Sequence, residues 1–106
     1  MYLVHAQLAP LAGGKLPREA MALVSDRVLE DRDIQHIAAH PDGPAGPVLG
    51  VFILAGSVEE AERRVAELCR GALRDSPGLH GSKLARCEVV LALPAGPRAE
   101  GGTAMA

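Results

Sequence analysis

The chain has 106 residues, a formal net charge of −2 at pH 7, 48% hydrophobic residues and 23% charged residues. This length predicts a single domain, and the composition excludes an intrinsically disordered chain. The only aromatic residues are Tyr2 and Phe52, too few for the stacking platform that binds single-stranded nucleic acid. Because phosphate binding also needs clustered excess Lys and Arg, we expect no nucleic-acid partner.

Several features favour a soluble cytoplasmic protein. Cys69 and Cys87 form no Cys-x-x-Cys motif, and two thiols make a poor disulfide framework, so we expect a reducing cytosol and two inward-facing structural cysteines. No basic residue precedes Lys15, unlike in a secretory signal. The longest apolar stretch, residues 48–55, is much shorter than the roughly 20 residues that span a bilayer. Arg outnumbers Lys nine to two, a bias typical of GC-rich bacterial genomes.

The first third of the chain predicts a strand followed by a helix. Residues 2–8 have the short apolar character of a strand, and the Pro and Gly residues of 9–15 predict a loop. The Gly13-Gly14-Lys15 triplet lacks the rest of a phosphate-binding loop. Pro17 suits the first position of a helix, and apolar residues at helical spacing continue to residue 28.

Residues 34–40 fit either a strand or a continuation of that helix. We predict a strand, because polar residues interrupt the helical stripe and a Pro- and Gly-rich loop follows at 41–47. In a helix, His36 and His40 would lie on one face and could share a metal ion. In a strand their Cα atoms lie about 13 Å apart, at roughly 3.3 Å per residue. With no third ligand apparent, we expect no metal.

The second half of the chain predicts a central strand, a long helix and a last strand. Residues 48–54 are apolar on both faces, as in a central strand. Ser57 and Glu60 form a capping box that begins a helix, and Glu and Arg residues four apart, such as Glu60 and Arg64, predict a self-compensating charged face. The helix ends at residues 76–78. Its predicted buried stripe is Val58, Ala61, Val65, Leu68, Cys69, Ala72 and Leu73.

The last strand, residues 84–93, places Cys87, Val89 and Leu91 on one parity, which we expect to face the helices. We expect the folded domain to cover residues 1–93 and the Pro-, Gly- and Ala-rich residues 94–106 to form a flexible tail.

This order of elements, β-α-β-β-α-β, predicts an α+β, ferredoxin-like fold. We expect a four-stranded antiparallel sheet with two helices on one face and an open face opposite. We further expect the first and third strands to be central and to run parallel to each other.

Side-chain parity predicts which residues occupy the open face. A register that pairs His5 with Glu88 also pairs Leu3 with Val90 and Gln7 with Arg86. A carboxylate beside an imidazole orients the ring, which makes His5 and Glu88 a candidate acid–base pair. The more common alternative is a polar cross-strand pair in a wet or dimeric interface. The full predicted set is Leu3, His5, Gln7, His36, Ala38, His40, Arg86, Glu88 and Val90.

Within this set we expect Leu3, Gln7, His36 and Arg86 to contact a ligand, and we expect no cofactor. His80, in a Gly-flanked loop, could also swing over the open face, although a solvated loop histidine is more common.

The chain resembles the dimeric α+β barrel group, which includes small antibiotic-biosynthesis monooxygenases and muconolactone isomerase-like proteins. The resemblance covers about residues 1–94 and rests on element order, size and an open face that mixes Leu3, Val90 and Val51 or Phe52 with His5 and Glu88. No family-specific motif carries over a catalytic residue. An exposed apolar sheet face on a small monomer also predicts self-association.

We therefore expect a cytoplasmic homodimer that binds a small organic ligand on its open sheet face. Its enzymatic role would be that of a cofactor-free accessory enzyme of bacterial secondary metabolism. The alternative is a non-enzymatic ligand-sensing or protein-interaction module. Full turnover retained by a His5→Ala variant would refute the acid–base role.

Overall fold

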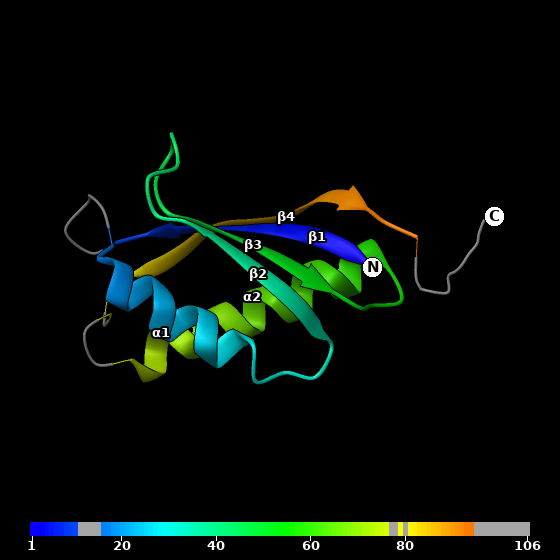
Figure 1. Cartoon of the computed structure of the whole chain (residues 1–106), viewed down its shortest axis with the longest axis horizontal. Coiled ribbons are helices and arrows are strands. Elements are labelled where there is room, and N and C mark those ends of the chain that lie inside the picture. Colours follow the sequence, from blue (N-terminus) through cyan, green and yellow to red (C-terminus); the bar gives the residue numbers. More distant parts are fainter. Residues whose placement is uncertain (11–15, 77–78, 80, 95–106) are drawn as a thin grey trace.

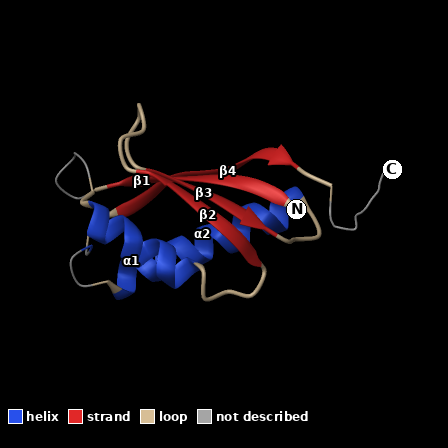
Figure 2. Cartoon of the chain, in the orientation of Figure 1, coloured by secondary structure: helices blue, strands red, loops and turns tan. Residues whose placement is uncertain are grey.

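The computed structural model describes residues 1–10, 16–76, 79 and 81–94. Its elements follow the predicted order: β1 (Tyr2–Ala9), α1 (Arg18–Val28), β2 (Ile34–His40), β3 (Val48–Ile53), α2 (Val58–Asp75) and β4 (Lys83–Ala92). The four strands form one sheet, and both helices lie against the same face of it (Figure 1; Figure 2). The prediction of a strand at residues 34–40 is confirmed, and the helical alternative is wrong.

The sheet has the strand order β2-β3-β1-β4, and every neighbouring pair is antiparallel. The central position of β1 and β3 is confirmed, but the expectation that they run parallel is wrong. Each strand–helix–strand unit returns the chain in its original direction, which makes β2 parallel to β1. Since β3 turns back from β2 as a hairpin, it must oppose β1. This α+β architecture is consistent with a ferredoxin-like fold.

The core lies between the helices and the sheet and is almost entirely aliphatic. Alternate residues of the central strands point into it, because successive strand side chains face opposite sides. Tyr2 packs at the border of this core. The fully or nearly fully buried strand and helix residues include Val4, Ala6, Leu8, Val24, Val28, Leu49, Val51, Ile53, Ala61, Val65 and Cys69.

The start of α2 follows its sequence signal, whereas α1 begins one residue later than predicted. The Ser57 Oγ accepts a hydrogen bond from the Glu60 N–H (3.1 Å), and the Glu60 Oε1 accepts one from the Gly56 N–H (3.1 Å). Val58, predicted in the buried stripe of α2, is 40% exposed, while Ala66 is buried. Pro17 lies just before α1 in an extended conformation, so that helix begins at Arg18.

Two irregularities in β4 change the predicted pairing of that strand. Val4 pairs with Val89 and Leu3 with Leu91, so Val90 is an extra residue in a bulge. A second register shift leaves Ala85 without a partner in β1. The expectations that Leu3 pairs with Val90, and that Leu91 faces the helices, are therefore wrong: Leu91 shares the open face with Leu3.

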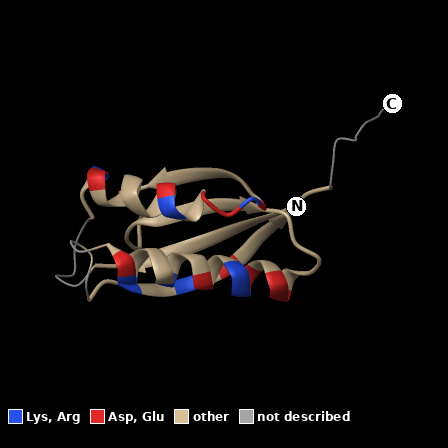
Figure 3. Cartoon of the chain, turned by 90° about the horizontal axis from the view of Figure 1, so that it is seen from below, with Lys and Arg blue, Asp and Glu red and all other residues tan. Residues whose placement is uncertain are grey.

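Charged residues concentrate on the two helices and on the turn after α1 (Figure 3). Arg64 of α2 donates hydrogen bonds to Asp33 (2.8 Å) and to both carboxylate oxygens of Asp31 (3.0 Å each). These hydrogen bonds connect α2 to the turn that leads into β2. They also raise the pKa of the Arg64 guanidinium, chiefly through the hydrogen bond to Asp33.

No helix in the described part of the chain is long and apolar enough to cross a bilayer. The predictions for Gly13-Gly14-Lys15, for His80 and for the tail over residues 95–106 concern residues outside those described.

Candidate functional site

Three rows of side chains cross the open face, because residues directly opposite in neighbouring strands share one face of a sheet. The central row contains the smallest side chains, at Gly50 and Ala38. The rows run from β4 to β2 as Leu91-Leu3-Phe52-His36, then Glu88-His5-Gly50-Ala38, then Arg86-Gln7-Val48-His40.

The predicted pairings of His5 with Glu88 and of Gln7 with Arg86 are confirmed. The Glu88 carboxylate, however, forms its ion pair with Arg86, with Oε1 3.5 Å from Nε. Within the described residues it makes no hydrogen bond to His5. His5 is therefore placed beside the carboxylate without being oriented by it in the single chain. Its acid–base role stays a prediction.

Side chains gather around Gly50 at the middle of the open face. A Cβ on Gly50 would lie 3.5 Å from the Leu3 Cδ1 and 3.8 Å from the Ala38 Cβ. The His36 ring lies with its centroid 5.7 Å from that of Phe52, tilted by 48°. Gly50 was not among the predicted site residues. A glycine inside an otherwise apolar central strand is the signal that could have indicated it.

Gln7 and Arg86 are engaged by their own chain. The Gln7 Nε2 donates a hydrogen bond to the Ala45 carbonyl in the β2–β3 loop, and Arg86 holds Glu88. Of the predicted ligand contacts, Leu3 lies against Gly50 at the middle of the face, and His36 lies on the edge strand β2 against Phe52. Gln7 and Arg86 lie at the end near that loop and the start of β4.

His36 and His40 lie on one strand, opposite Phe52 and Val48, which separates them along β2. Among the described residues, no group of three or more His, Cys, Asp or Glu side chains is arranged to hold a metal ion.

The two cysteines face inward, as predicted. Cys69 is fully buried, and burial raises the pKa of its thiol to about 12. Cys87 is half-buried, and its Sγ donates a hydrogen bond to the Glu62 carbonyl (3.5 Å). Burial and, next, the charge of Glu62 raise the pKa of the Cys87 thiol to about 11. Both thiols therefore stay protonated at neutral pH, which disfavours a nucleophilic role.

Surface pockets of the described residues, between about 340 and 500 Å³, lie beside the helices and at the β2–β3 loop. None of these is lined by His5, Gly50 or Phe52. These pockets therefore lie away from the centre of the open face.

Comparison with protein-family models, with curated proteins and with solved structures finds no match for this chain.

Proposed function

We propose that two copies of this chain pair through their open sheet faces and enclose a cavity that binds a small organic ligand. The observation that supports this most is that charged residues on the face are confined to the edge strand β4, which carries Arg86 and Glu88. No Lys, Arg, Asp or Glu occurs within β1, β2 or β3. Interface cores are depleted in charged residues in the same way.

The end of the open face near the start of β1 supplies the apolar contact. Leu91 is 48% exposed and Val90 47% exposed in the single chain. With Leu3 and Phe52 in the same region, they form a patch that pairing with a second copy would remove from water. Such patches on small monomers mark interaction sites.

The middle of the face suits a small, largely aliphatic ligand with hydrogen-bonding groups. Gly50 and Ala38 are the smallest residues of the central row, and Leu3 and His5 lie beside them on β1. Imidazoles can donate to or accept from a polar ligand atom. Phe52 is the one aromatic ring in this region of the described chain, so stacking on a planar cofactor is not the expected mode of binding.

Two roles for such a dimer differ in what His5 does. In an enzyme, His5 would act as acid or base, oriented by Glu88. The ion pair between Arg86 and Glu88 favours the alternative, a non-enzymatic ligand-binding module in which His5 only contacts the ligand. Native mass spectrometry of the purified protein tests this directly: a bound small molecule that survives incubation unchanged supports the binding module, whereas its conversion, lost in His5→Ala, supports the enzyme.

The dimer is tested by sedimentation equilibrium at micromolar protein concentration. We expect a dimer that Leu91→Glu dissociates, with a dissociation constant at least about tenfold higher, because a buried carboxylate lacks a partner. The matched control is Leu23→Glu on α1, where the side chain is 54% exposed on the helical layer. A monomeric wild-type protein, or an equal effect of both substitutions, would contradict the proposal.

A further inference from the structure

A groove runs between α2 and β4, on the opposite side of the sheet from the open face. It consists of two adjoining pockets of about 500 and 400 Å³ that share Arg70 and Leu84. Volumes of roughly 300–1,000 Å³ are typical of small-molecule sites. The groove is formed by one chain alone and needs no second copy.

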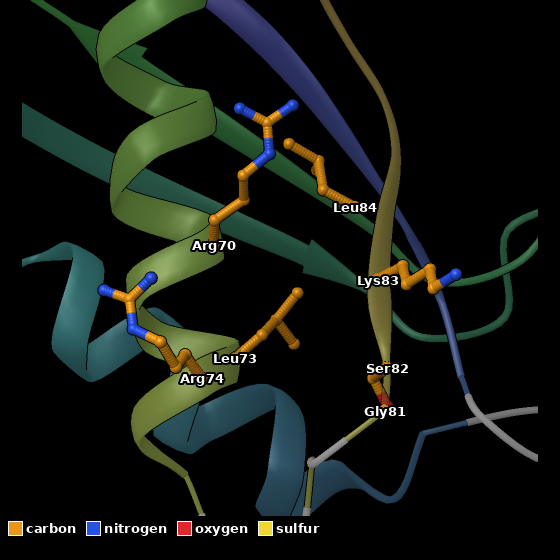
Figure 4. A pocket seen from close by; sticks show the side chains of 7 residues that line it. All are labelled: Arg70, Leu73, Arg74, Gly81, Ser82, Lys83 and Leu84. Carbon is orange, nitrogen blue, oxygen red and sulfur yellow. The ribbon is translucent and has the colours of Figure 1, made fainter.

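The larger pocket is lined by the aliphatic side chains of Leu73 and Leu84, and Arg70 lies beside them (Figure 4). Figure 4 shows Leu73 projecting from α2 into the space beside β4, and Arg70 extending from α2 toward Leu84. Leu73 is only 3% exposed, and Leu84 packs against the core. A ligand lying there would contact aliphatic side chains along its body and a guanidinium at one end.

Arg70 differs from the other arginines of α2 in having no carboxylate partner among the described residues. Arg63 pairs with Glu67 (3.4 Å), and Arg64 with Asp31 and Asp33. Arg74 approaches Asp75 (3.8 Å). Within the described part of the chain, Arg70 makes neither a hydrogen bond nor an ion pair. Its planar fork of donors is free to bind a carboxylate or phosphate.

The acidic residues of the groove lie toward the other end. Glu59 and Glu62 line only the smaller pocket, and the Glu62 Oε2 already accepts a hydrogen bond from the Val89 N–H (2.8 Å). Arg74 and Lys83 also line the larger pocket, so this end of the groove is cationic and the carboxylates lie at the other end. An anionic head group would bind to the Arg70 guanidinium.

We propose that the α2–β4 groove binds a small amphipathic anion, with an aliphatic body on Leu73 and Leu84 and a carboxylate or phosphate head group on Arg70. This site is separate from the open face and does not depend on dimerisation.

The test uses octanoate as the probe, titrated into the full chain while the Leu73 and Leu84 methyl signals are followed by NMR. We expect saturable shifts that weaken with added salt. Arg70→Gln should raise the dissociation constant about tenfold, the size of effect expected for loss of one charge-assisted contact. Because Arg70 has no partner to lose, the thermal melting curve of this variant should match that of the wild type.

Two variants and two alternative ligands serve as controls. Arg32→Gln removes an exposed arginine of the α1–β2 turn that does not line the groove, and it should leave octanoate affinity unchanged. Octyl phosphate in place of octanoate identifies the preferred head group. Octanol binding as tightly as octanoate, or no saturable shift at millimolar octanoate, would overturn the site. Leu91→Glu should leave octanoate affinity unchanged, so failure of the dimer and failure of this site are distinguishable.

Discussion

Cys69 lies fully buried on the inner face of α2, where a thiolate would lose its hydration and gain only a weak compensating interaction with Arg70. Burial is accordingly the main cause of its raised pKa, with a smaller contribution from Cys87. The residue acts as a small apolar side chain in the folded state. In the unfolded chain the same thiol ionises at much lower pH, and this difference links its protonation to stability.

The linkage predicts a loss of stability at alkaline pH. The folded pKa of about 12 lies above the ordinary value of 9.0, so the contribution of Cys69 is fully present below about pH 9 and is lost as the pH rises toward 12. The slope is about 1.4 kcal/mol per pH unit. In urea unfolding, the difference in unfolding free energy between wild type and Cys69→Ala should shrink by about 2 kcal/mol from pH 8 to 10.5. An unchanged difference would show that the thiol ionises equally in both states.

At the scale of elements, Arg64 is the main polar link between α2 and the turn before β2. Its side chain is 22% exposed and that of Asp31 23%, so their interaction is less screened than that of a surface pair. The arginine binds two carboxylates at once, which a lysine cannot reproduce.

We expect Arg64→Met to lower the free energy of unfolding by about 1–3 kcal/mol, because two partly buried aspartates lose their partner. Arg64→Lys should recover only part of this. Arg63→Met is the matched control, since Arg63 is 61% exposed and pairs only with Glu67; its effect should stay within about 0.5 kcal/mol. Chemical denaturation measures all three, and equal losses at positions 63 and 64 would contradict the role of Arg64.

Local sequence patterns predicted the elements well and the long-range contacts poorly. The predicted ion pair between Glu60 and Arg64 is present, with 3.9 Å between the carboxylate oxygen and the guanidinium nitrogen. The closer partners of Arg64, however, lie 31 and 33 residues away in the chain. Helical periodicity contains no information on such partners. They become neighbours only when the turn after α1 packs beside α2.

On the open face, local sequence patterns likewise predict only part of the strand pairing of β4. His5–Glu88 and Gln7–Arg86 were predictable because these pairs lie between the two bulges of β4, where strict alternation holds. Val89, Val90 and Leu91 are all apolar, so alternation gives no sign of the bulge among them. One extra residue there moves Leu91 to the opposite face of the sheet.

At the scale of the whole molecule, Gly50 lies at the centre of the surface that we propose to form the dimer. A Cβ there would meet its neighbours at 3.5–3.8 Å, ordinary contact distances. Gly50→Ala should therefore fold and dimerise normally. Gly50→Val adds two further methyl groups beyond that Cβ, and these must displace the Leu3 or Ala38 side chain toward the open face.

We expect Gly50→Val to keep the thermal melting curve of a folded chain but to weaken ligand retention and dimerisation at least about tenfold. Native mass spectrometry and sedimentation equilibrium measure the two effects separately. Loss of the ligand with the dimer intact would locate the cavity at Gly50. Unchanged ligand retention and dimerisation would place both away from the centre of the face.

The contact between Glu62 and Val89 limits how copies of this chain can assemble. An edge strand normally offers free backbone groups to which further strands can add, and this route leads to fibres. In β4 the Val89 N–H donates its hydrogen bond to the Glu62 carboxylate, and bulges at Ala85 and Val90 interrupt the regular edge. Two-fold pairing through the open face uses each copy's surface once and is closed. With the β4 edge obstructed, the proposed dimer is not expected to grow by strand addition at that edge.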